Sequence, residues 1–272
     1  GVPNFMKAYV SIFKLRMANG MQYRIAALAG VATQLFFGLI FIMILVAFYR
    51  HSGTEMPITL PQLAAYIWLQ QACLSLIMLW FRDNELFQLI TTGNIAYELC
   101  RPTNIYGFWF SKLLAMRLSS AILRCFPVLF VAFLLPEPYR MSLPPSPVHL
   151  ILFIVALILG LFILVAISML IYVSTFITMS PTGSLLIFAL MGEFLAGLTI
   201  PIPLFPVWLQ NIIYALPFHW TADFPFRVYS GHISAHDAWM SLPQQLAWII
   251  VLVGLGMLAM RAALRRVVVQ GG

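Results

Sequence analysis

Charged residues are scarce in this chain. They make up 8% of its 272 residues, whereas a soluble globular protein carries about 25%. Hydrophobic residues make up 62% of the sequence, and a soluble fold of this size has too few polar groups to cover that much apolar surface. The composition therefore excludes an ordinary soluble domain and indicates a protein whose solvent is the lipid bilayer.

The sequence also lacks the short motifs that would give it chemistry of its own. It contains no G-x-x-x-x-G-K-[ST] loop to hold the phosphates of ATP, and neither H-E-x-x-H nor G-x-S-x-G occurs. No Asp lies in the apolar runs, so the pair that an intramembrane aspartyl protease needs is missing. We therefore expect no catalytic centre and no bound cofactor in this chain.

Metal-binding patterns are weak. Three cysteines are present without metal spacing, and we interpret them as free thiols. His232-x-x-x-His236-Asp237 places two imidazoles one helical turn apart, as in a zinc pair. Only one carboxylate accompanies them, and Ser234 to Asp237 fits the cap of a helix start better. We therefore predict no metal site.

Apolar runs fill most of the chain, and about 20 helical residues are enough to cross a bilayer. They predict a single all-α domain, residues 1–272, with six transmembrane helices. The predicted spans are about 25–49, 61–81, 118–135, 148–173, 184–200 and 244–263. Residues 4–24 carry aromatic and apolar side chains at helical spacing among basic ones, which predicts an interfacial amphipathic helix. A proline-rich segment at 201–242 interrupts the pattern, with a short apolar helix near 206–216.

Lys and Arg residues gather beside the apolar runs, and cytoplasmic loops are enriched in these cations. With six spans and the N-terminus inside, only Arg50, Arg140 and Arg227 fall outside. The cytoplasmic side receives Lys7, Lys14, Arg16, Arg24, Arg82, Arg101, Lys112, Arg117, Arg261, Arg265 and Arg266. We therefore predict that both termini are cytoplasmic. The net charge of +7 then reflects topology and headgroup contacts, not a nucleic-acid partner.

Glu193 is the one carboxylate deep in a predicted span. A charge is costly to bury there, so the residue is a functional candidate. It could line a substrate path or pair with Arg124 of the third span, or it could be a structural or protonated group between helices. Gln34, Gln70 and Gln71 also lie within spans, where amides join helices or face a cavity. The sequence leaves these alternatives open.

The least apolar stretch of the chain, residues 83–117, separates the second and third predicted spans. The pattern from Asp83 to Ile90 predicts a short amphipathic helix with Leu86, Phe87 and Ile90 on one side. The glycine at position 93 indicates where this helix ends. A compact polar element between two spans suits the docking of a soluble partner, although an ordinary loop touching headgroups would share this pattern.

After this helix the chain shows an alternating pattern, in which Ile95, Tyr97 and Leu99 are separated by single residues and Pro102 breaks the chain. The whole stretch from Ile90 to Pro102 reads I-x-x-G-x-I-x-Y-x-L-x-R-P. The candidate docking residues are Asp83, Glu85, Leu86, Phe87, Ile90, Gly93, Tyr97, Glu98 and Arg101.

This motif resembles one in permease subunits of ABC-2 type transporters, the six-span membrane subunits of ATP-binding-cassette exporters. The N-terminal interfacial helix, the loop between spans two and three, and a broken extracellular hairpin at about 201–228 are similar to that family as well. The resemblance covers the layout of the whole chain.

The resemblance implies a permease that moves a drug-, peptide- or lipid-like compound outward across a bacterial inner membrane. Two permeases, identical or homologous, would pair above two ATPase subunits that hold ATP and magnesium, and residues 83–101 would dock into the ATPase. Two other readings remain: a proton-coupled secondary transporter that uses Glu193, and a membrane scaffold that transports nothing.

Overall fold

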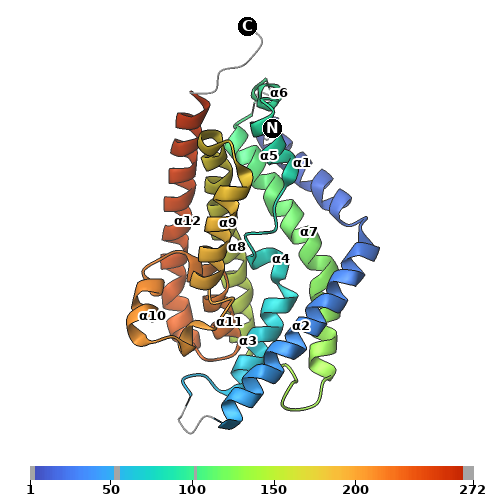
Figure 1. Ribbon diagram of the computed structural model, residues 1–272, viewed down its shortest axis with the longest axis vertical. Helices are drawn as coiled ribbons and strands as arrows, with labels where there is room; N and C mark the ends of the chain where they lie inside the picture. The colour runs from blue at the N-terminus through green and yellow to red at the C-terminus, as the bar shows by residue number, and fades with distance from the viewer. Residues whose placement is uncertain (1–3, 52–55, 101–102, 266–272) are drawn as a thin grey trace.

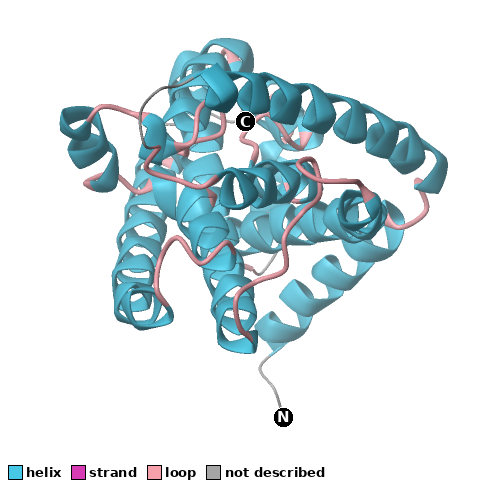
Figure 2. Cartoon of the chain, turned by 90° about the horizontal axis from the view of Figure 1, so that it is seen from below, coloured by secondary structure: helices cyan, strands magenta, loops and turns pink. Residues whose placement is uncertain are grey.

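The computed structural model describes residues 4–51, 56–100 and 103–265, and within them every regular element is a helix (Figure 2). The predicted all-α fold is therefore confirmed. The elements are α1 (Asn4–Gly20), α2 (Arg24–His51), α3 (Leu60–Ala72), α4 (Leu74–Ile77), α5 (Asn84–Thr91), α6 (Ile95–Leu99), α7 (Ile105–Leu134), α8 (Pro147–Thr178), α9 (Pro181–Leu195), η1 (Ile202–Leu204), α10 (Val207–Tyr214), η2 (Phe218–Thr221), α11 (Asp223–Tyr229) and α12 (Ala235–Leu264).

Four helices of the described chain are long and apolar enough to cross a bilayer: α2 from Ile25 onward, α7, α8 and α12. They have 27 to 32 residues, which corresponds to roughly 40–48 Å at the rise of an α-helix. The central one is α8, which packs against α12, α11, α7, α9 and α5. Its middle turns are almost completely buried, so the hydrophobic core forms around it.

Two of the six predicted spans are not single crossing helices. Residues 61–81 form α3, which has 13 residues, and the four-residue α4. The helix breaks at Cys73, and Met78 is already extended. The predicted span 184–200 is instead α9, which has 15 residues and ends at Leu195. Four of the six predicted spans are therefore long single helices and the other two are shorter or broken, because hydropathy reports an apolar environment and not an unbroken backbone.

The broken segment nevertheless runs the length of the molecule. In Figure 1, α3 lies at one end, α4 near the middle and α5 at the opposite end. The beginning of α1 and the end of α12 lie at the same end as α5 and α6. Segments without a spanning helix can thus still carry the chain from one face to the other.

The third and sixth predicted spans begin too late. Helix α7 begins at Ile105 instead of 118, and Asn104 caps it by accepting hydrogen bonds from the amides of Tyr106 and Gly107. Helix α12 begins at Ala235 instead of 244, and Ser234 caps it by accepting from the Asp237 amide at 3.1 Å. The predicted cap at Ser234 is confirmed. Polar residues in the first turns lower the hydropathy, so both predicted apolar spans begin later than the helices that contain them.

Helix α1 confirms the predicted N-terminal helix and packs along α7. The contact is close at Gly20, where an added Cβ would meet the side chain of Ser119. After Gly20 the chain turns sharply into α2 (Figure 1). A side chain at this position would force Ser119 or the end of α1 to shift.

Between α9 and α12 the chain is divided into the short helices η1, α10, η2 and α11. Helix α10 corresponds to the short apolar helix predicted near 206–216. These elements lie toward the end of the molecule opposite α5 (Figure 1). Helix α11 and η2 pack against α8 and are buried, whereas Val207, Trp208 and Ile212 of α10 are exposed.

Candidate coupling site and its buried polar contacts

Helix α5 forms where the sequence predicts an amphipathic helix. Asp83 caps it by accepting a hydrogen bond from the Glu85 amide at 2.9 Å, which satisfies a free N–H of the first turn. Leu86, Phe87 and Ile90 are buried and α5 packs on α8. The ring of Phe87 lies 4.4 Å from that of Tyr172. The predicted apolar face of this helix is confirmed.

Salt bridges fasten the start of α5 to two other helices. Lys112 of α7 lies 2.8 Å from Glu85 Oε2 and 3.3 Å from Asp83 Oδ2. Arg16 of α1 donates to the same Glu85 oxygen. The hydrogen bond from Arg16, followed by that from Lys112, lowers the pKa of Glu85 to about 2. The carboxylate of Glu85 is thus ionised near neutral pH and connects α1, α5 and α7.

Helix α8 also contacts the start of α5. The amide of Asp83 donates to the hydroxyl of Tyr172 on α8 at 2.8 Å. Both Asp83 and the Lys112 side chain are nearly buried, with 7% of each side chain exposed. The start of α5 is therefore attached to α1, α7 and α8 together, and a displacement of α5 would pull on all three helices.

The end of α5 has the conformation that its glycine predicts. Gly93 has φ of 77°, in the region that L-residues avoid and glycine adopts freely. Ile95, Tyr97 and Leu99 then lie in the short helix α6, so the alternating pattern did not mark an extended segment. Ile95 is buried, whereas 75% of Tyr97 and 42% of Leu99 are exposed. The predicted residue Arg101 lies outside the described residues.

Sequence reasoning missed the role of Arg117, which lies on α7 and is 1% exposed. Its Nη1 donates to the carbonyls of Ser75 and Met78 at 3.0 and 2.8 Å, and its Nη2 donates to the carbonyl of Phe81 at 2.8 Å. The hydroxyl of Ser168 lies 3.3 Å from Nη2. These carbonyls follow the break at Cys73, so one guanidinium satisfies the backbone that the missing helical turns would otherwise have paired.

A second missed network lies on the other side of the break. Asp223 of α11 is fully buried and pairs with Arg227 at 3.2 Å. The hydroxyl of Tyr66 on α3 lies 3.1 Å from Asp223 Oδ1 and 3.0 Å from the carbonyl of Gly197. Tyr214 of α10 accepts from Arg227 at 2.8 Å. The network ties α3 to the short helices that follow α9.

The spacing of Asp223 and Arg227 in the sequence could have predicted their ion pair. Asp223 and Arg227 lie four residues apart, which places opposite charges on one helical face. Lys112 and Arg117 gave a weaker signal, because they lie in the polar stretch between two predicted spans. Only the start of α7 at Ile105 places them inside the bundle.

The intramembrane polar candidates have separate surroundings. Gln70 donates to the carbonyl of Leu198 at 2.7 Å, a helix-joining contact. Gln71 is buried and lies against Gly38 of α2. Gln34 is buried, and its amide has no hydrogen-bond partner within the described chain. The structure does not gather these glutamines into one site.

Glu193 and Arg124 do not pair within the residues that the structure describes. The guanidinium of Arg124 lies against Gly30 of α2, where an added Cβ would be 2.8 Å from Arg124 Cζ. Glu193 lies on α9, and its buried Oε1 has no hydrogen-bond partner among the described residues. The predicted interhelical pair is replaced by two separate polar groups.

Comparison with known proteins adds one finding. A family model described as "ABC-2 family transporter protein" matches residues 30–271. No curated protein and no solved structure matches the chain significantly. The matched region includes α5 and α6, both buried networks, the whole of α7, α8 and α12, and α2 from residue 30 onward.

Proposed function

The chain belongs to the ABC-2 transporter family, and on that premise we propose that it is the permease subunit of an ATP-driven exporter. The family implies a partner ATPase subunit. We further propose that α5, α6 and the turn between them, residues 84–99, form the coupling element that docks onto this ATPase. We propose as its cargo a drug-, peptide- or lipid-like compound, as the resemblance to ABC-2 permeases implies.

The observation that carries this proposal is the attachment of α5 to α1, α7 and α8 through Asp83, Glu85 and Lys112. A loop that merely touches lipid headgroups needs no such fastening. A docking element does, because force applied by a partner must reach the spanning helices. The exposed rings and chains of Tyr97 and Leu99 on α6 supply apolar surface for that partner.

The assembly that follows has two permeases, identical or homologous, above two ATPase subunits. ATP and magnesium bind in the ATPases, and catalysis takes place there and not in this chain. The coupling element, the start of α1 and the end of α12 face the cytoplasm of a bacterial inner membrane. In this topology six segments cross the bilayer, and α3 with α4 forms one broken crossing and α9 another.

Gly93→Val should uncouple ATP hydrolysis from export. The space around Gly93 is open, with no atom within 4 Å of an added Cβ, so the effect comes from the backbone. A β-branched residue is strongly disfavoured at positive φ, and the turn that orients α6 would change. We expect substrate-stimulated hydrolysis to fall at least about tenfold, the equivalent of about 1.4 kcal/mol, measured with the co-expressed ATPase in proteoliposomes.

Gly93→Asn is the matched control, since asparagine tolerates this backbone region far better. It should retain most of the stimulated hydrolysis and export. Equal activity of Gly93→Val, Gly93→Asn and the native chain would show that the turn does not orient a docking element. Failure of the chain to co-purify with any ATPase would contradict the permease proposal itself.

The unpaired buried oxygen of Glu193 is the observation that favours a second candidate, a proton-coupled secondary transporter. Glu193→Gln distinguishes the two mechanisms because it removes the titratable group and keeps the shape. In an ATP-driven exporter we expect transport to stay within about twofold of the native rate, a difference under about 0.5 kcal/mol. Transport that responds to an imposed pH gradient without ATP, and is abolished by this substitution, would establish the second candidate instead.

A further inference from the structure

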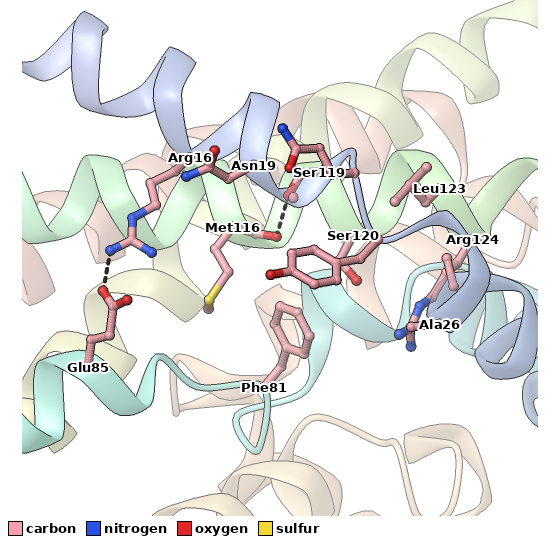
Figure 3. Close-up of a pocket in the computed structure, with 14 residues that line it drawn as sticks. Arg16, Asn19, Ala26, Phe81, Glu85, Met116, Ser119, Ser120, Leu123 and Arg124 are labelled. Carbon is pink, nitrogen blue, oxygen red and sulfur yellow. Dashed lines mark hydrogen bonds and ion pairs between the residues drawn. The ribbon is translucent and has the colours of Figure 1, made fainter.

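A cavity of about 580 Å³ lies where α1 turns into α2. Its walls come from the last turns of α1, the first turns of α2, the middle of α7 and the segment that leads into α5. In Figure 3, Arg16 and Glu85 lie on one side of the space and Arg124 on the other, and Ser119 and Ser120 lie between them on α7. The cavity is thus bounded by cations at both ends.

Arg16 and Arg124 differ in whether they have a partner of opposite charge. Arg16 donates to Glu85, which Lys112 also contacts, so that carboxylate is shared by two positive charges. Arg124 has no hydrogen bond or ion pair within the described residues, and its buried Nε lacks a partner. A guanidinium carries five N–H donors. Arg124 therefore brings an uncompensated positive charge and free donors to the wall of the cavity.

The backbone makes room for this guanidinium instead of pairing it. The guanidinium rests directly on the backbone of α2 at Gly30, where an added Cβ would lie 2.8 Å from Arg124 Cζ. A partly buried guanidinium without a partner can be completed by a ligand of opposite charge. Phosphate groups suit arginine because its planar fork donates two parallel hydrogen bonds.

We propose that this cavity binds a phosphate-bearing anion between Arg124 and Arg16, and that its usual source is the headgroup of an anionic phospholipid. The cavity lies beside the turn from α1 into α2, where the apolar side chains of Ile25 and Leu28 are exposed, so a neighbouring lipid can approach it. Basic pockets between membrane helices bind such headgroups. Met116, Leu123 and the exposed ring of Tyr23 give the cavity an apolar rim suited to the start of acyl chains.

Such a site reaches beyond the proposed transport function. Arg16 touches both the anion and Glu85 of the coupling site, so an occupied cavity would also brace the start of α5. Binding does not depend on the chain being a permease, because the cavity is formed by this chain alone. Loss of lipid binding and loss of ATPase coupling can therefore be observed separately.

The test uses the purified chain in detergent micelles without any ATPase. Retained phosphatidylglycerol is counted by native mass spectrometry, and the thermal midpoint is followed as phosphatidylglycerol or phosphatidylcholine is added. Arg124→Gln should weaken phosphatidylglycerol binding about tenfold or more, the loss expected for a charge-assisted contact. Ser120→Leu keeps every cation but fills the cavity, and it should weaken binding to a similar extent.

Arg261→Gln is the matched control. It removes one exposed positive charge at the end of α12, away from this cavity. It should leave phosphatidylglycerol binding within about twofold of the native chain, because unspecific attraction is spread over many surface charges.

Inorganic phosphate and glycerol phosphate distinguish the two sources of the anion. Stabilisation by millimolar phosphate that requires Arg124, without any preference for phosphatidylglycerol, would identify a soluble phosphate as the ligand. Equal effects of Arg124→Gln and Arg261→Gln, or unchanged lipid binding in Ser120→Leu, would place any bound lipid elsewhere and overturn the proposal.

Discussion

Arg117→Ala will destabilise the folded chain by about 3 kcal/mol or more, because it leaves buried carbonyls without donors and each such group costs about 1–3 kcal/mol. The guanidinium donates to the carbonyls of Ser75, Met78 and Phe81. Water does not reach this position, since Arg117 is 1% exposed. The thermal midpoint in detergent and the fraction of folded protein after size-exclusion chromatography measure the loss.

The variant Arg117→Lys tests whether the positive charge alone, or the forked shape of the guanidinium, stabilises the break after α3. A lysine keeps the positive charge but has one nitrogen, which cannot span the carbonyls on both sides of the guanidinium fork. We expect it to recover less than half of the lost stability. Arg140→Ala provides the surface reference, because Arg140 and its partner Glu137 are more than half exposed and such pairs contribute about 0–1 kcal/mol. Equal losses for Arg117→Ala and Arg140→Ala would show that the break after α3 needs no support.

Asp223→Ala is expected to cost about 3–5 kcal/mol, the usual effect of removing one partner from a buried ion pair. Asp223 is fully buried and 16% of the Arg227 side chain is exposed, so the arginine charge loses its counter-ion where little water can replace it. The hydroxyl of Tyr66 loses an acceptor at the same time. Urea or thermal unfolding in detergent provides the measurement, and limited proteolysis should reveal cleavage within 196–234 first.

The double variant with Arg227→Met and Asp223→Ala tests the cause. Removing both charges removes the unpaired cation, so the double variant should be more stable than Asp223→Ala alone. Tyr66→Phe should cost about 1 kcal/mol, as expected for one hydrogen bond. A double variant that unfolds as easily as the sum of the single ones would mean that packing of Asp223, and not its charge, holds the segment.

Much of the local structure was predictable because it depends on neighbours in the sequence. The helix from Asn84 to Thr91 follows from a capping Asp83 and apolar residues at helical spacing, and Gly93 ends it. Ser234 marks the start of α12 in the same way. In each case the donor and acceptor lie within three residues of one another, so a short window of sequence contains the whole interaction.

The misplaced boundaries have a different origin. The start of α7 was placed 13 residues late because Lys112 and Arg117 lower the local hydropathy. Their charges are matched by Asp83, Glu85 and backbone carbonyls from the preceding segment. The break at Cys73 was not predicted because no glycine or proline lies near it in the sequence to mark the end of a helix. A hydropathy scale gives the free energy of placing a single residue in lipid, and it takes no account of a partner that another helix provides.

The sequence by itself determined that the chain is helical, lies in a membrane and carries a polar element between two apolar stretches, because composition and helical periodicity set these properties residue by residue. The tertiary structure decided how buried charges are satisfied and where a helix breaks. Arg117 meets Ser75 across 42 residues, and Tyr66 meets Asp223 across 157. Contacts at such separations arise only when helices pack, so neither the networks nor the cavity beside Arg124 can be read from a linear pattern.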